Sequence, residues 1–242
     1  MSAERTAAVS GESFALAEGL RETRGALDRW RADPGSVLGP WFAGALAVAF
    51  ALLGAVWLVS TLATADATPL YLAGVESSPE PGDALPVLGR NLLVLALHAT
   101  ACIAGFIAGS SMHRVAATKT GISRVIHERA GPVAIAWVIA VTIFSLLTQS
   151  LGLGLNAATM AAQLDISSGV LMLTVLPHAL IELTAIFLPL AAWLIASRRG
   201  EWGDLFAATF VTVALALPML LVAVAIELTL WPRLLELASP VT

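Results

Sequence analysis

Two residues that can bind a proton or a cation, a histidine and a glutamate, lie close together in an otherwise apolar stretch of this sequence. His178 and Glu182 are four positions apart in the run from Leu176 to Leu183. On an α-helix, side chains four positions apart lie on the same face, one turn from each other. The two side chains can therefore bind each other or a common partner.

A proline stands directly before this histidine. Because Pro177 has no backbone N–H, inside a helix it leaves the carbonyl of Leu173 without its usual hydrogen bond. We therefore expect a kink or an exposed backbone acceptor beside His178. Pro218 is placed in the same way in a later apolar run, where it frees the carbonyl of Ala214.

Apolar runs long enough to cross a bilayer must position these groups. The chain is 58% hydrophobic and only 12% charged, whereas soluble domains carry about 25% charged residues. About 20 apolar residues form a helix that spans a hydrocarbon core roughly 30 Å thick. Five such runs occur, at about residues 40–63, 91–110, 132–155, 169–196 and 206–231. The sequence therefore predicts an all-α, polytopic membrane helix bundle with five transmembrane helices within residues 36–242.

The distribution of cationic residues predicts the orientation of these helices. Eleven of the 13 Lys and Arg residues lie before the first run, between the second and third, or between the fourth and fifth. Cytoplasmic loops of membrane proteins carry an excess of Lys and Arg. The N-terminus is therefore predicted in the cytoplasm and the C-terminus outside.

The first 35 residues form a separate cytoplasmic segment in this prediction. Part of the segment has apolar side chains on one face of a helix and charged ones on the other. The segment is interpreted as an amphipathic helix lying at the membrane interface, or alternatively as a soluble helix packed on the cytoplasmic loops. The apolar face comprises Leu16, Leu20, Leu27 and Trp30.

Polar residues of three spans are predicted to lie at similar depths in the outer leaflet, counting about 1.5 Å per residue. If they face one another across the bundle, they form a proton-sensitive or ion-binding site or line a narrow cavity. The alternative interpretation is that they make hydrogen bonds that hold the helices in register. This intramembrane polar cluster comprises Arg90, Asn91, His98, His178, Glu182 and Glu227.

Several functional classes find no support in the residues. The His-Glu-x-x-His, Gly-x-Ser-x-Gly and Walker A motifs are absent, so no catalytic residue is assigned. The single cysteine, Cys102, excludes an intramolecular disulfide and a cysteine-based zinc site. No metal site or cofactor is expected. The net charge of -4 does not suit a nucleic-acid-binding protein.

Small residues recur every four positions on the second span, at Ala101, Gly105 and Gly109. Such residues let another helix approach closely. The approaching helix belongs to the same chain, to a second copy in a homo-oligomer, or to another membrane protein. Tryptophans near the ends of the spans are interpreted as anchors at the membrane interface; they are Trp41, Trp57, Trp202 and Trp231.

Two motifs of the chain resemble the stage II sporulation protein M family of integral membrane proteins. That family has a proline-histidine-to-glutamate motif in a late span, which Pro177, His178 and Glu182 match. It also has a glutamate near the outer end of the last span followed by a proline, which Glu227 and Pro232 match.

The resemblance covers about residues 40–232 in span order, while the acidic N-terminal segment lies outside it. Two positions depart from the family pattern. The family's second span opens with an asparagine pair, of which Asn91 is present while Arg90 takes the other place. Ala179 replaces the glycine that commonly follows the histidine.

The resemblance implies a non-enzymatic, multi-pass subunit of a bacterial or other prokaryotic cytoplasmic membrane. The sporulation member works with cell-wall-degrading partners during engulfment of the forespore. Besides the lipid bilayer, the expected partners are therefore other membrane or envelope proteins, including proteins that remodel the cell wall. The leading interpretation is a scaffold or assembly subunit that organises such partners. The alternatives are a small transporter or channel subunit with a His/Glu-lined polar path, and an intramembrane hydrolase without a known motif.

Overall fold

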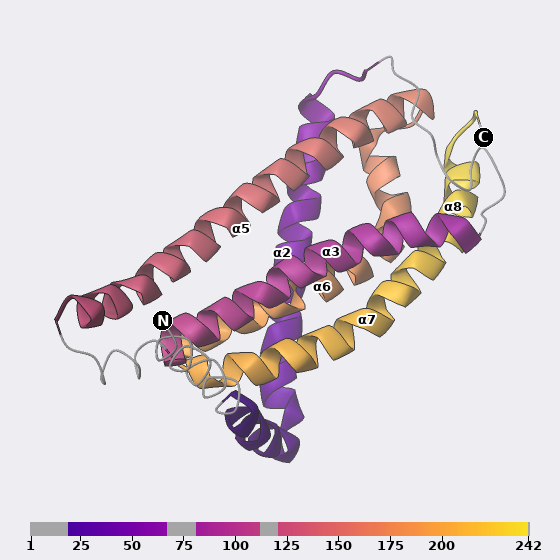
Figure 1. Ribbon diagram of the computed structural model, residues 1–242. Coiled ribbons are helices and arrows are strands. Elements are labelled where there is room, and N and C mark those ends of the chain that lie inside the picture. The colour runs from indigo at the N-terminus through magenta and orange to yellow at the C-terminus, as the bar shows by residue number, and fades with distance from the viewer. Residues whose placement is uncertain (1–18, 67–80, 112–120, 242) are drawn as a thin grey trace. The chain divides into compact units, whose positions relative to one another are not determined.

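The computed structural model describes residues 19–66, 81–111 and 121–241 (Figure 1). Residues 19–32 are helical. The helices that follow are α2 (Pro34–Leu62), α3 (Ala84–Phe106), α5 (Gly121–Gln163), α6 (Ser168–Arg199), α7 (Leu205–Thr229) and α8 (Trp231–Ala238). Short 3₁₀ segments precede α3 (Pro81–Asp83) and α7 (Trp202–Asp204), and a π-helical segment follows α3 (Ile107–Ser111). The described residues contain no strand.

Five of the described helical segments are long and apolar enough to cross a membrane. This confirms the predicted all-α class with five transmembrane helices and identifies a multi-pass membrane protein. The candidate spans are Pro34–Leu62, Ala84–Gly109, Ile135–Gln163, Ser168–Arg199 and Trp202–Ala238. Hydrocarbon offers no hydrogen-bond partner to the backbone, and a helix satisfies its backbone groups internally.

Two helices extend well beyond the predicted apolar runs. Helix α3 begins at Ala84 instead of residue 91, and α5 continues to Gln163 instead of ending at residue 155. The polar residues that ended the predicted third run are compatible with a helix, because the Thr159 hydroxyl donates back to the Leu155 carbonyl at 3.2 Å. The chain turns only at Asp165, whose positive φ of 53° is typical of the residue after a helix.

The chain packs as two compact units, and each of the five long helices contributes residues to both. Unit 1 comprises the described residues of Met1–Ala43, Leu97–Ala140 and Leu188–Ala214. Unit 2 comprises the described residues of Gly44–Ala96, Val141–Phe187 and Leu215–Thr242.

In unit 1, α3 lies closely against α6 at the small residues predicted to allow such an approach. A Cβ atom added at Gly105 would lie 2.7 Å from Trp193 Nε1. The Cys102 Sγ donates a hydrogen bond to the Pro189 carbonyl at 3.0 Å, and the cysteine is fully buried. Ala101 is buried as well, and the Trp202 ring occupies the space that a side chain at position 109 would need. Within unit 1, these small residues therefore serve internal packing.

The N-terminal helix of residues 19–32 also belongs to unit 1. Its most buried residues are Gly19, Thr23 and Ala26, whereas Leu20 is half exposed. Trp30 packs edge-on against Trp41, with 5.2 Å between the ring centroids. Leu16, the first residue of the predicted apolar face, lies outside the described residues. The buried face is thus rotated away from the predicted one, which leaves Leu20 exposed.

Unit 2 is joined by hydrogen bonds that connect residues distant in sequence. The Ser168 hydroxyl donates to the Ser60 carbonyl at 3.3 Å, and the Asp66 backbone N–H donates to the Thr159 hydroxyl at 3.0 Å. The Ser239 hydroxyl, beyond α8, donates to the Leu164 carbonyl at 2.6 Å. These bonds connect α6 with α2, the end of α2 with α5, and the C-terminal residues with the end of α5.

We predict that Gly105→Ala lowers the free energy of unfolding by roughly 1–3 kcal/mol, because its methyl group would overlap the Trp193 indole. Gly89→Ala in the same helix is the matched control, since a Cβ there meets nothing within 4 Å. The control is expected to be neutral or stabilising by up to about 1 kcal/mol. Unfolding of the purified protein in mixed detergent micelles measures both. Equal stability of the two variants would contradict the close packing of α3 on α6.

Candidate functional site

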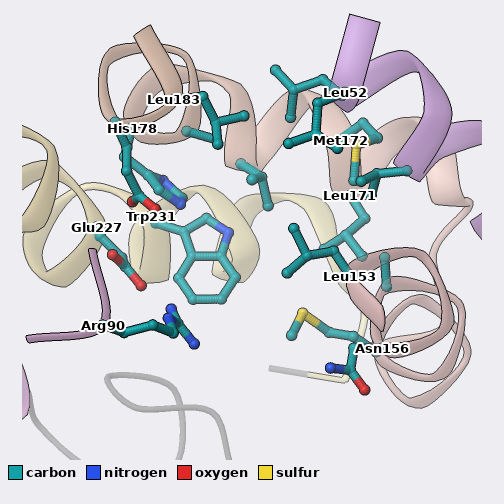
Figure 2. A pocket seen from close by; sticks show the side chains of 17 residues that line it. Leu52, Arg90, Leu153, Asn156, Leu171, Met172, His178, Leu183, Glu227 and Trp231 are labelled. Carbon is teal, nitrogen blue, oxygen red and sulfur yellow. The ribbon is translucent and has the colours of Figure 1, made fainter. Parts of the chain in front are cut away.

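Unit 2 contains a cavity of about 260 Å³ at the place where its six helices meet (Figure 2). Every lining residue belongs to this unit. The lining residues are Leu52, Leu53 and Val56 of α2; Arg90 of α3; Leu153, Asn156, Ala157 and Met160 of α5; Leu171, Met172, Val175, His178, Ala179, Glu182 and Leu183 of α6; Glu227 of α7; and Trp231 of α8.

The cavity has a polar side and an apolar side. Figure 2 shows His178, Glu227, Arg90 and Trp231 on one side, and Leu52, Met172, Leu171 and Leu153 on the other. On the polar side, the imidazole of His178 and the indole of Trp231 are in contact, with ring centroids 5.6 Å apart and planes inclined by 58°. The α-helical spacing of four residues places Glu182 one turn beyond His178 on the same wall.

Four buried polar atoms in and beside the cavity have no hydrogen-bond partner in the part of the chain that the structure describes. They are His178 Nδ1, Glu227 Oε2, Trp231 Nε1 and Asn91 Nδ2. Three of these side chains are almost completely buried, with exposed fractions of 6% for His178, 9% for Trp231 and 3% for Asn91. Each unsatisfied buried group costs about 1–3 kcal/mol. Native proteins contain few such atoms, and a molecule of the right size in this cavity could satisfy several of these at once.

The charges at the cavity are unbalanced. Two carboxylates, those of Glu182 and Glu227, interact electrostatically with the single guanidinium of Arg90 and with each other. Asn91 lies beside the Glu182 carboxylate. Both glutamates are partly buried, whereas Arg90 is exposed. The guanidinium therefore lies at the edge of the cavity, and the two carboxyl groups lie farther inside it.

Four of the six residues of the predicted polar cluster line this cavity: Arg90, His178, Glu182 and Glu227. Asn91 lies beside them, as described above. His98 does not line the cavity; it is buried in unit 1, where it has an interaction of its own.

The two prolines leave their helices continuous in secondary structure: α6 runs through Pro177 and α7 through Pro218.

Trp231 is the principal cavity residue that the sequence does not predict, because its place near the end of a span indicates an interfacial anchor. In the structure it is buried and its indole forms part of the cavity wall. Because α7 ends at Thr229 and α8 begins at Trp231, helical spacing from Glu227 does not predict this position.

The cavity residues can form hydrogen bonds, pair with charges, contact an apolar group and exchange protons through His178 and the glutamates. Among the described residues, no group of three or more His, Cys, Asp or Glu side chains is placed to hold a metal ion. The arrangement is thus suited to binding an organic molecule more than a multiply coordinated metal.

No protein-family model, curated protein or solved structure matches this chain. The resemblance to the stage II sporulation protein M family therefore rests on its five motif residues, as predicted from the sequence. Three of these, His178, Glu182 and Glu227, line the cavity. The motif residues of a late span and of the last span thus meet at one place within unit 2.

We predict that Glu227→Met raises the free energy of unfolding of the ligand-free protein by about 1–3 kcal/mol, because it removes an unsatisfied buried acceptor. Ser239→Ala is the matched control, since it removes a buried hydroxyl that has a partner, the Leu164 carbonyl. The control is expected to lose about 1 kcal/mol. Unfolding in detergent measures both variants. If Glu227→Met destabilises the protein as Ser239→Ala does, the polar cluster holds the helices together and is not arranged for a ligand.

Proposed function

We propose that this protein is a non-enzymatic integral membrane scaffold or assembly subunit that organises partner proteins, similar to the stage II sporulation protein M family. The supporting observation is the exposure of the membrane-spanning part of α5. Only 12% of the most apolar 18 residues of this span are buried, compared with 72% in α6. This stretch of α5 therefore has little contact with its own chain and has surface available for a partner helix.

The exposed surface of α5 is large and contains aromatic residues. Trp137 is 70% exposed, Phe144 is 68% exposed and Leu147 is 58% exposed. Of the described side chains from 135 to 153, only Ser150 is buried. Aromatic residues are enriched in protein interfaces, where they supply a large contact area.

Polar side chains on the same stretch favour a protein neighbour over lipid alone. Gln149 Nε2 donates to Ser145 Oγ at 2.9 Å, which uses only one of its two N–H groups. A glutamine in a membrane span gains about 0.6–2 kcal/mol from a hydrogen bond to another helix. A partner helix lying along α5 would provide such a bond, whereas lipid tails would not.

The proposal includes the orientation and location predicted from the sequence. The N-terminus lies in the cytoplasm and the C-terminus outside, in the cytoplasmic membrane of a prokaryote. The excess of Lys and Arg in the segments assigned to the cytoplasm supports this arrangement. The partners are membrane or envelope proteins, including proteins that remodel the cell wall, in keeping with the family resemblance.

A photo-crosslinking amino acid at Leu147 of α5 is expected to capture a discrete membrane protein in native membranes. The matched control is the same amino acid at Leu221 of α7, which is 59% exposed compared with 58% for Leu147. The control is expected to yield lipid adducts. Gel electrophoresis and mass spectrometry identify the products. Lipid adducts alone at both positions would refute α5 as the partner surface.

Alkaline phosphatase fused after the C-terminus is expected to be active, because this enzyme folds in an oxidising compartment outside the cytoplasm. Green fluorescent protein fused to the N-terminus is expected to fluoresce in the cytoplasm. In the control, green fluorescent protein is fused to the C-terminus and alkaline phosphatase to the N-terminus. If the C-terminal phosphatase were inactive and the C-terminal fluorescent protein were fluorescent, the C-terminus would lie in the cytoplasm and the proposed orientation would be wrong.

A small transporter or channel subunit is the second candidate, and the cavity containing His178 and Glu182 is the observation that favours it. A path for ions needs polar groups along its whole length. The polar residues that line the cavity all belong to unit 2. The cavity therefore supports binding more directly than passage, and solute flux into liposomes distinguishes the two.

A further inference from the structure

The buried charge of the cavity sets the first requirement for its occupant. Glu182 and Glu227 bring two carboxylates, and the one guanidinium, that of Arg90, is exposed. Both carboxyl groups interact with this one guanidinium. An occupant that carries one positive charge would therefore balance the site.

The size and lining of the cavity exclude a bare inorganic ion as a sufficient occupant. Eleven of its 17 lining residues are Leu, Val, Met or Ala. At about 30 Å³ for each water-sized group, the volume of about 260 Å³ corresponds to roughly nine non-hydrogen atoms. An inorganic cation would leave the apolar side uncovered, and the described residues offer it no cluster of three ligands.

The unpartnered atoms match an ammonium group. Glu227 Oε2 and His178 Nδ1 can each accept a hydrogen bond and have no partner among the described residues. An ammonium group offers three N–H donors, which is enough to serve both of these acceptors. The indole of Trp231, in ring contact with His178, adds an aromatic face that attracts cations.

We propose that the cavity of unit 2 binds a small amphipathic organic cation, that is, a protonated amine carrying an apolar group. The ammonium lies against His178 and Glu227, and the apolar group lies against the leucine and methionine side chains of α2, α5 and α6. Binding of an amine goes beyond the proposed role of organising partner proteins and does not depend on that role. It is tested on the purified protein alone.

Phenethylamine is the probe, because it has nine non-hydrogen atoms, one ammonium and one apolar ring. Calorimetric titration of the full chain in detergent is expected to show saturable binding of phenethylamine. The neutral 2-phenylethanol and the anionic 3-phenylpropionate are expected to bind at least about tenfold more weakly, since the alcohol carries no charge and the carboxylate is repelled by Glu182 and Glu227. Absence of amine binding, or equal binding of the alcohol, would overturn the proposal.

Glu227→Gln is expected to weaken phenethylamine binding at least about tenfold, because it removes a charged acceptor while keeping the side chain's size. Glu236→Gln on α8 is the matched control, since Glu236 is exposed and does not line the cavity. Its affinity should equal that of the unaltered protein. Unchanged binding by a folded Glu227→Gln would contradict the assignment.

Leu153→Trp provides a second test if Glu227→Gln does not fold. Leu153 lines the cavity but is 45% exposed, so a larger side chain there can enter the cavity without disrupting a packed core. This variant is expected to abolish binding of phenethylamine. Retention of full affinity would place the amine elsewhere and overturn the proposal.

The amine in the cell is either a free small molecule or the headgroup of an aminolipid. Titration in nanodiscs of phosphatidylcholine, with and without phosphatidylethanolamine, distinguishes these sources. Weaker phenethylamine binding in the presence of phosphatidylethanolamine would identify the lipid as a competitor. Equal affinity in both nanodiscs would identify a free amine. Both results support the same ammonium site.

Discussion

Hydrocarbon provides no hydrogen bonds, and the rest of this structure depends on that constraint. A backbone that crosses the bilayer must pair its N–H and C=O groups internally, which the five long helices do. Hydroxyl side chains in the spans follow the same rule by donating to carbonyls of the preceding turn. Thr212 donates to Ala208 at 2.7 Å, and Thr229 donates to Ala225 at 2.6 Å. Such residues are polar in composition but make no demand on neighbouring helices.

The cavity of unit 2 departs from this rule. His178, Glu227 and Trp231 each keep a buried polar atom that no described group satisfies, although the apolar surroundings make such atoms expensive. The same unit satisfies other buried polar groups, as Ser239 does with the Leu164 carbonyl. Trp193 Nε1 in unit 1 also has no partner among the described residues, but four such atoms gather in and beside this one cavity, where a bound molecule could satisfy them.

The sequence predicts the number and class of the helices because length and hydropathy alone determine whether a segment can span a bilayer. It does not predict where α3 begins or α5 ends, because polar residues next to an apolar run can continue a helix. The juxtaposition of His178 and Glu182 follows from helical spacing.

The depth in the membrane, estimated from the helical rise per residue, correctly predicts that Arg90 and Glu227 lie at the same site. The same estimate fails for His98, which lies about 10 Å beyond Asn91 along α3. The role of Trp231 could not be predicted from its place at the end of a span, because interfacial and buried tryptophans occur at the same sequence positions. Only the turn between α7 and α8 directs its indole into unit 2.

Helix α8 is held at both ends. Its first residue, Trp231, forms part of the cavity wall, and just beyond its last residue Ser239 is bonded to the Leu164 carbonyl. Between these two points Leu235 is fully buried, while Leu237 is 86% exposed. The place of the indole in the cavity wall therefore depends on the packing of Leu235 and on the hydrogen bond of Ser239.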